Sequence, residues 1–352
     1  MSYHIVNGFN YQVFNHLFQT RGQQGNVAFS GVSLYSLLAV ISVGLRGRTG
    51  DQVSKFLNQN FSELYDESTW MYSGVATTLK SFNTMVGEAW DINNILFHSF
   101  GVKDHFQKVS KELFNLTIEQ IDFFQSMEAM EQMNQWVAEK TGGLIRDLFK
   151  IPPSSVTMLV FINTLLFQAN WLSPFELEHT KQETFTDDQG QQFTVEMMNK
   201  RDSFRIFQDL DNHIDYLFIP FSNRKTYAVI SLPHNGHSLE NIMKNAQFEI
   251  STSLDMISTL NHFGVIDLFT PSMADLSGIT SIPGFITDLF QVSTFVVDEI
   301  GARASASSAG VDVAEGRFRH IKFFANKPFI IHIFSSESKV ILFSVAVTNP
   351  NI

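Results

Sequence analysis

The stretch that most constrains this chain runs from Glu299 to His320 and lies between two predicted strands, Val292–Asp298 and Ile321–Ile333. Its first half is almost wholly alanine, serine and glycine and carries a single charge, at Arg303. A solvated linker would contain more proline, lysine and glutamate, and a core strand more valine, isoleucine and phenylalanine. Small uncharged residues favour a segment that is exposed in one state and packed into a crowded site in another.

Before this stretch, the sequence predicts helices first and strands later. Apolar spacing and end signals predict helices over Phe9–Arg21, Ser33–Val43, Thr49–Leu57 with Thr49 as its cap, Lys103–Phe114, Ser126–Lys150 and Ser253–Phe263. Strands are predicted over Asp91–Phe100, Met158–Trp171, Tyr216–Phe221, Thr226–Leu232, Phe329–Phe334 and Val340–Val347. This order indicates an α+β fold. Because no internal repeat or interdomain linker is present, we expect a single domain over residues 1–352.

Composition excludes several function classes. The net charge is −11 with no run of lysine or arginine, which argues against a nucleic-acid partner. There is no cysteine, so thiol catalysis and zinc–thiolate sites are excluded. No apolar run reaches the length of a membrane span, and Met1–Phe18 lacks the pattern of a secretory signal. Localisation therefore stays open between the cytoplasm and, for a trimmed chain, the extracellular space.

The search for catalytic motifs predicts no enzyme. The nucleophile elbow, the dinucleotide and phosphate loops and the H-E-x-x-H zinc motif are all missing. His234 and His237 have an H-x-x-H spacing, but they lie in a turn after a strand, and we interpret them as a surface turn. Acidic pairs such as Asp187 and Asp188 are expected on solvated faces of a chain with 35 acidic residues. We expect no cofactor and no metal.

Several motifs, in order along nearly the whole chain, resemble those of the serpin family of serine-protease inhibitors. The matching stretches are Asn26-Val-Ala-Phe-Ser30 with Ser33, Gly44–Gln52, Asn134–Ile145, Asn163–Phe175, Ala274–Ile279 and Asn326–Phe329. The resemblance implies a serpin fold with three β-sheets, a helical N-terminal half and an exposed reactive-centre loop at about residues 299–320. It also implies a shutter and breach, where the main sheet opens, at Ser30, Gly31, Asn163, Trp171 and Gln291.

By the same resemblance, the opening stretch contains the loop hinge. Its residues Glu299, Gly301, Ala302, Ala304, Ala306 and Ser308 match the family pattern, with Arg303 in place of the usual glutamate. In such inhibitors a protease cleaves the loop, and the freed half inserts as a new strand in the main sheet. Alternate residues of an inserting strand face the core, where a charged or bulky side chain would be costly. Counted from Ala302, every second residue to Gly310 is small, and Arg303 has the other parity.

Three features depart from the family pattern. Gly31 stands at the usual proline position, and Gln291 aligns with a histidine that helps close the sheet. Because glutamine can still hydrogen-bond, we expect an altered shutter network and a changed tendency to form latent or polymeric species. The chain is also short between Pro233 and Phe248, so the elements usually found there are truncated. Asp66–Phe82 has no basic helix, and we expect no heparin binding.

The position of the scissile bond has two interpretations. In most inhibitory members it follows the sixteenth residue after the hinge glutamate, which gives Glu315–Gly316 and an acid-preferring protease. The alternative bond, Arg317–Phe318, would suit a trypsin-like protease. The run Val311–Ala314 would suit an elastase-like one.

The sequence thus predicts a monomeric inhibitor that traps a serine protease as a suicide substrate. The alternative is a non-inhibitory serpin-fold protein that acts as a binding module or chaperone. The altered shutter and the shortened segment favour this second hypothesis.

Overall fold

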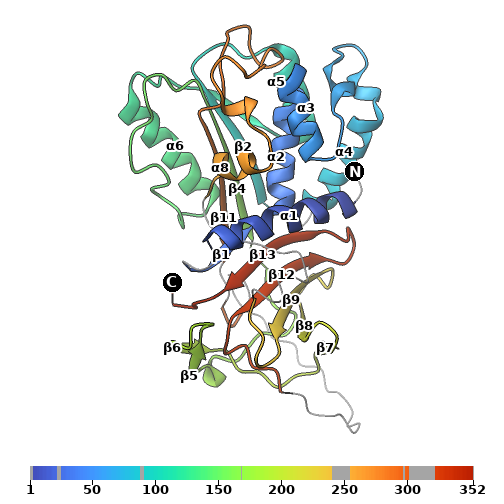
Figure 1. The fold of residues 1–352 in the computed structure, drawn as a ribbon, viewed down its shortest axis with the longest axis vertical. Coiled ribbons are helices and arrows are strands. Elements are labelled where there is room, and N and C mark those ends of the chain that lie inside the picture. The colour runs from blue at the N-terminus through green and yellow to red at the C-terminus, as the bar shows by residue number, and fades with distance from the viewer. Residues whose placement is uncertain are drawn as a thin grey trace.

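The computed structural model describes residues 3–21, 25–87, 91–167, 169–239, 254–295, 298–300 and 322–351. Within these residues the strands form three sheets, of six, five and two strands. The five-stranded sheet and most helices make up one end of the elongated molecule, and the six-stranded and two-stranded sheets make up the other (Figure 1). The three-sheet α+β architecture expected from the sequence is confirmed.

The helices gather around the five-stranded sheet (Figure 1). They are α1 (Tyr3–Arg21), α2 (Gly31–Val43), α3 (Gly47–Phe56), α4 (Gly74–Gly87), α5 (Asp104–Phe114), α6 (Ser126–Lys140) and α8 (Ile257–His262). Short 3-10 turns are η2 (Ser62–Tyr65), η3 (Trp70–Tyr72), η4 (Leu177–His179) and η5 (Asp267–Phe269).

Each sheet joins strands that lie far apart in the chain. The five-stranded sheet has the order β10 (Leu254–Asp255), β11 (Asp288–Phe295), β4 (Leu159–Phe167), β2 (Asp91–His98) and β3 (Thr117–Gln120). The six-stranded sheet has the order β1 (Val27–Phe29), β13 (Ile341–Val347), β12 (Phe329–Ser335), β9 (Thr226–Pro233), β8 (Ile214–Pro220) and β7 (Arg205–Asp209). The third sheet pairs β5 (Lys181–Thr186) with β6 (Gln192–Met197).

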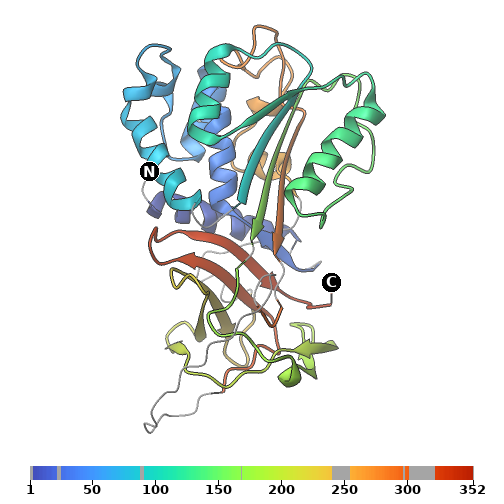
Figure 2. The same cartoon turned by 180° about the vertical axis from the view of Figure 1, so that it is seen from behind.

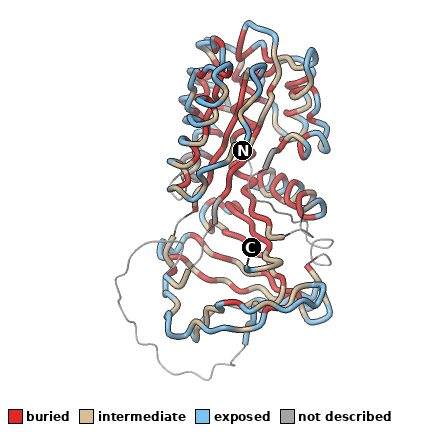
Figure 3. Tube along the Cα trace, turned by 90° about the vertical axis from the view of Figure 1, so that its left-hand side faces the viewer, coloured by how far each residue is buried: buried red, intermediate tan, exposed pale blue. Residues whose placement is uncertain are grey.

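Helix α2 lies in the centre of the molecule because it is apolar on every side. All of its residues except Ser36 are buried. A helix with no polar face is stable only where other elements surround it completely. Ser30 caps its start by accepting a hydrogen bond from the backbone N–H of Ser33 at 3.2 Å. Figure 3 shows the buried chain continuing through the middle of both ends of the molecule.

The five-stranded sheet is covered on both faces, so its strands are almost continuously apolar. On one face Met133, Trp136 and Val137 of α6 pack in a cluster that includes Ile162 of β4 and Val292 of β11. On the other face, the residues of opposite parity belong to the larger core that contains α2. Figure 2 shows α6 beside β4 and β11, seen from behind. Helix α6 therefore packs over the junction of β4 and β11.

Helix α6 ends ten residues before the predicted Lys150. Gly142 and Gly143 follow it with φ of 60° and 79°, a left-handed conformation that stops a helix. The chain then turns back, and the Asn134 side chain holds it by two 2.9 Å hydrogen bonds with the backbone N–H and C=O of Phe149. The apolar residues after Lys140 therefore belong to a segment that turns back and packs, and they do not form a further helical turn.

Two other predicted elements are shorter than expected. The helix predicted over Ser253–Phe263 is limited to α8, because Leu254 and Asp255 are extended and pair with Gln291 and Phe290 of β11. The strand predicted over Ile321–Ile333 is limited to β12, which begins at Phe329. Among the described residues, no helix is both long and apolar enough to cross a membrane.

Candidate functional site

The shutter residues lie in one row across the five-stranded sheet. Asn163, in the middle of β4, is directly opposite Asn94 of β2 on one side and Gln291 of β11 on the other. All three side chains are at least 97% buried. Because neighbours along a strand face opposite sides, all three belong to the face that meets α2 and not the face that meets α6. The structure therefore brings Asn163 and Gln291 together as the sequence predicted, and adds Asn94.

A chain of hydrogen bonds ties this row to the start of α2. The Ser33 hydroxyl donates to Asn163 Oδ1 at 2.7 Å, and Asn163 Nδ2 donates to Asn94 Oδ1 at 2.9 Å. Gln291 Nε2 donates to the Ser30 carbonyl at 2.9 Å and to Asn163 Oδ1 at 3.3 Å. The contact between Gln291 and Asn163 is thus a side-chain hydrogen bond that crosses the junction of β4 and β11.

Gln291 satisfies only half of its hydrogen-bonding groups. Its Oε1 atom is buried and has no hydrogen-bond partner among the described residues. A buried amide oxygen without a partner typically costs about 1–3 kcal/mol. Gln291 Nε2 therefore stabilises the closed junction of β4 and β11 by donating to two acceptors. The unpaired Oε1 of the same side chain destabilises the closed junction.

Gly31 and Ser30 connect the shutter to the six-stranded sheet. The Gly31 N–H donates to Asn10 Oδ1 at 3.0 Å, and the Ser30 hydroxyl donates to the Leu342 carbonyl at 2.7 Å. A Cβ at position 31 would lie within 2.6 Å of three atoms of Asn10, two of them next to or on the backbone of α1. Glycine at this position is thus matched to the close approach of α1.

A buried histidine extends this connection. His332 of β12 lies 3.0 Å through Nδ1 from the Ser344 hydroxyl, which also accepts from Asn10 Nδ2 at 3.4 Å. Burial lowers the pKa of His332 to about 3, because the charged imidazolium is poorly solvated there. His332, Asn10 and Asn94 were not identified from the sequence. A polar residue within an otherwise apolar stretch of strand is the signal that points to Asn94 and His332.

The breach residue Trp171 holds the start of the predicted loop. Its indole Nε1 donates to the Asp298 carbonyl at 3.0 Å, and its backbone N–H donates to the Ile300 carbonyl at 3.1 Å. The indole stacks on Phe221 with ring centres 4.6 Å apart. Trp171 is therefore fixed by packing on one side and binds the chain after β11 on the other.

Glu299, the predicted hinge glutamate, lies at the same place. Glu299 accepts a hydrogen bond through its carbonyl from the Phe175 N–H at 2.7 Å, and through its carboxylate from the Thr180 hydroxyl at 2.8 Å. The other predicted hinge residues, Gly301, Ala302, Ala304, Ala306 and Ser308, lie outside the described residues, as do Glu315, Gly316, Arg317 and Phe318 of the two candidate bonds.

The breach and the shutter lie along one line. Strands β4 and β11 are parallel and in register from Val160–Asp288 to Phe167–Phe295, so their C-terminal ends lie together. The pair Asn163–Gln291 lies four residues before that end, roughly 13 Å at 3.3 Å per residue. A strand that enters this junction from Glu299 has to break the contacts of Trp171 first and the bond between Gln291 and Asn163 later.

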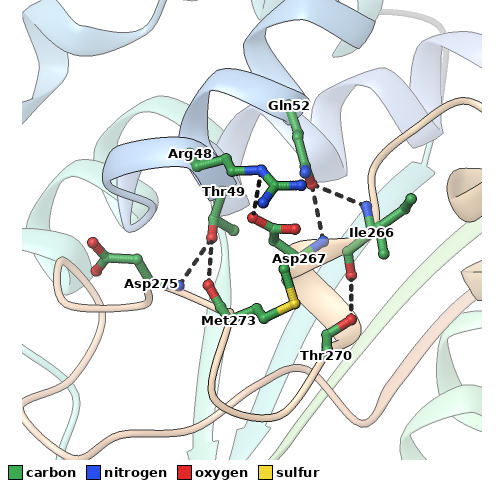
Figure 4. Close-up of polar contacts among 8 residues, drawn as sticks. All are labelled: Arg48, Thr49, Gln52, Ile266, Asp267, Thr270, Met273 and Asp275. Carbon is green, nitrogen blue, oxygen red and sulfur yellow. Dashed lines mark hydrogen bonds and ion pairs between the residues drawn. The ribbon is translucent and has the colours of Figure 1, made fainter.

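A second polar cluster fixes the segment that precedes β11 (Figure 4). Gln52 Oε1 of α3 accepts from the backbone N–H groups of Ile266 and Asp267 at 3.0 and 2.9 Å. Arg48 lies 3.3 Å through Nε from the carboxylate of Asp267, whose side chain is 3% exposed. These side chains hold η5 against α3.

Thr49 also contacts this segment and is not the helix cap that the sequence predicted. Helix α3 begins at Gly47, so Thr49 lies in its first turn. The Thr49 hydroxyl accepts from the Asp275 N–H at 3.0 Å and donates to the Met273 carbonyl at 3.3 Å (Figure 4). The local sequence around Thr49 predicts a helix cap. The hydrogen-bond partners of Thr49 lie more than two hundred residues later in the sequence, so the local pattern could not reveal them.

Comparisons with known proteins agree with this geometry. The model of the serpin family, described as "Serpin (serine protease inhibitor)", matches residues 4–247 and 246–350. The leukocyte elastase inhibitor of Xenopus tropicalis is 29% identical over 359 residues, and human Serpin B9 is 27% identical over 363 residues. The alignments cover 93% and 92% of this chain, and 93% of each relative. The crystal structure of native protease nexin-1 with heparin has a TM-score of 0.84 at 21% identity and covers 98% of both chains.

Proposed function

Because this chain belongs to the serpin family, whose members are typically protease inhibitors rather than enzymes, we propose that it inhibits a serine protease as a suicide substrate. The protease cleaves one bond within the loop that follows Glu299. The freed N-terminal half of the loop inserts between β4 and β11 and carries the acyl-bonded protease with it. The catalytic serine and histidine belong to the protease, and this chain supplies the bait and the folding energy.

The observation that carries the proposal is the parallel pairing of β4 and β11, with the loop starting at their shared end. A strand that returns from the end of β11 runs antiparallel to both neighbours. Its insertion replaces one parallel pairing of eight residue pairs with two antiparallel pairings, which are slightly more stable per residue. The closed five-stranded sheet therefore lies above the inserted state in free energy and is held there by a barrier.

The barrier arises from contacts that insertion has to break. These are the hydrogen bonds of Trp171, Phe175 and Thr180 to residues 298–300, then the bond between Gln291 and Asn163. Helix α6 also has to shift, since its side chains pack across both strands. The small residues Ala302, Ala304 and Ala306 support the proposal from the sequence, because they share the parity that would face the core in an inserted strand.

The target follows from the scissile bond, for which we retain both hypotheses. Cleavage at Glu315–Gly316 implies an acid-preferring protease, and cleavage at Arg317–Phe318 implies a trypsin-like one. One of the two relatives is named an elastase inhibitor, which supports protease inhibition as the activity. The choice of target protease is set by the loop sequence of this chain.

The test is a protease panel with trypsin-like, elastase-like and glutamate-specific enzymes. We expect one protease to form a complex that survives SDS, with cleavage at one of the two bonds mapped by mass spectrometry. Cleaved protein should melt at a markedly higher temperature than intact protein. Loop cleavage without a complex and without a rise in melting temperature would instead support the non-inhibitory binding role.

A matched pair of variants tests the insertion step itself. Ala304→Arg places a long charged side chain at an inward position, so the loop should be cleaved as a substrate with the complex reduced by at least tenfold. Ser305→Arg adds the same side chain one residue later, at an outward position, and should retain the complex. Equal loss in both variants would contradict insertion with the predicted parity.

A further inference from the structure

Three histidines from two segments meet at one end of the six-stranded sheet. His213 precedes β8 and His234 follows β9, next to the strand pair Ile214–Pro233. The His234 N–H donates to the His213 carbonyl at 2.8 Å, and the His237 N–H donates to the His234 carbonyl at 3.1 Å. Two main-chain hydrogen bonds therefore hold the backbones of the three histidines together. The H-x-x-H turn predicted from the sequence is present, but with a third imidazole beside it.

The imidazole rings lie close to one another and near solvent. The rings of His213 and His237 stack with centres 4.3 Å apart, and the centres of His213 and His234 are 6.0 Å apart. His213 is exposed, and the other two are partly buried. Among the described residues, no hydrogen bond involves a ring nitrogen of His213 or His237. These two rings can therefore rotate about their side-chain bonds to bring a nitrogen toward His234.

Asp215 orients the third ring. Its Oδ1 lies 3.0 Å from His234 Nε2 and also accepts from Gln208 Nε2 at 3.2 Å. A carboxylate on one ring nitrogen is the usual support of a metal-binding histidine, because it fixes the ring and leaves the other nitrogen for the ion. In His234 that other nitrogen is Nδ1.

The charge around the cluster also favours a cation. Asp215 lies within the cluster and Asp209 lies near enough to His213 to interact electrostatically. Lys327, whose ammonium donates to Asn235 Oδ1 at 2.8 Å in the same turn, interacts with both Asp215 and Asp188. Two carboxylates, Asp215 and Asp209, thus lie beside the histidines, and the Lys327 ammonium in the same turn opposes part of their charge.

We propose that His213, His234 and His237 bind a divalent transition-metal ion, with Asp215 as a positioning residue. Neutral imidazole is a preferred ligand of Zn²⁺, Cu²⁺ and Ni²⁺, and three imidazoles with one open position form a common zinc set. The rings as they lie do not yet converge on one point, so binding requires rotation of His213 and His237 until the nitrogen–zinc distances reach about 2.0–2.1 Å.

The experiment is calorimetric titration of the chelator-treated full chain with Zn²⁺. We expect one ion per chain, bound with micromolar affinity. His213→Asn and His237→Ala should each weaken binding at least tenfold. Asparagine is chosen at position 213 because the backbone there has φ of 58°, which asparagine tolerates. Asp215→Asn should weaken binding about tenfold, as loss of an orienting carboxylate usually does.

The matched control is His179→Ala. His179 belongs to a different exposed group, with Glu176 and Glu178, whose oxygen and nitrogen atoms lie within 4.8 Å of one another. This variant should bind Zn²⁺ as the wild type does. The proposal is overturned if the wild type shows no binding at about 100 µM Zn²⁺, roughly a hundred times the expected micromolar dissociation constant, or if His179→Ala abolishes binding while His213→Asn retains it.

Discussion

Very unequal losses of stability are expected from two apolar substitutions on either side of the β4–β11 junction, Asn163→Leu and Gln291→Met. Asn163 accepts from the Ser33 hydroxyl at 2.7 Å and donates to Asn94 Oδ1 at 2.9 Å, and both partners are buried. Leucine would leave each without a partner. Since an unpaired buried group costs about 1–3 kcal/mol, the loss should be about 2–6 kcal/mol.

Gln291→Met should cost far less, although it removes two hydrogen bonds. The Ser30 carbonyl still accepts from the Leu34 N–H at 3.1 Å, and Asn163 Oδ1 still accepts from Ser33. The two lost bonds are worth about 0.5–1.5 kcal/mol each, and removal of the unpaired Oε1 returns about 1–3 kcal/mol. The two effects nearly cancel, and methionine at position 291 should therefore lie within about 2 kcal/mol of the wild type.

The assay is urea-induced unfolding followed by tryptophan fluorescence, together with the rate at which heated protein leaves the native monomer in size-exclusion chromatography. Asn163→Leu should lower the urea midpoint strongly. It should also accelerate loss of the native monomer on heating, because each 1.4 kcal/mol by which the closed state alone is destabilised raises that rate about tenfold. If Gln291→Met is as destabilised as Asn163→Leu, the hydrogen-bond accounting at the junction is wrong.

Three other predictions concern the surroundings of the site. Because the pKa of folded His332 is lowered to about 3, below the usual value near 6.5, the folded state binds fewer protons than the unfolded state between these pH values. Stability should be complete above about pH 6.5 and fall toward pH 3, by at most about 5 kcal/mol. His332→Gln should flatten this part of a urea-midpoint curve measured from pH 7 to 4.5, and an unchanged slope would contradict the assignment. Gln52→Leu should cost about 1–3 kcal/mol in urea unfolding because it leaves the buried Asp267 N–H unpaired, whereas Gln52→Glu keeps the acceptor and should cost less. Trp171→Phe keeps an aromatic ring on Phe221 but removes the hydrogen bond to the Asp298 carbonyl, and it should cost about 0.5–1.5 kcal/mol of stability. Trp171→Ala also removes the packing and should cost about 3–5 kcal/mol. Equal costs would show that packing on Phe221 is unimportant.

Local sequence was sufficient where one physical signal dominated. The apolar run of α2 predicts a buried helix, and Gly44 correctly marks its end. The apolar residues of β4 predict a strand, and the family resemblance assigns the asparagine in its middle to the shutter, where the structure shows a polar contact in the sheet. The family motifs extended this to the three-sheet fold, because they occur in order along the chain. Alternation of small residues after Glu299 also predicts insertion by the rule of strand parity, but these residues lie outside the described part of the chain and their insertion stays a prediction.

The partners of these residues were decided only by the tertiary structure. Asn163 required the register of β2, β4 and β11 before Asn94 and Gln291 could be placed beside it. The glycine at position 31 became explicable only when α1 was packed against it. Side-chain alternation is a property of a few neighbouring residues and can be read from the sequence. Hydrogen-bond partners in a sheet are chosen by strand order and register, which depend on contacts between segments far apart in the sequence, 69 residues for Asn94 and Asn163 and 128 for Asn163 and Gln291.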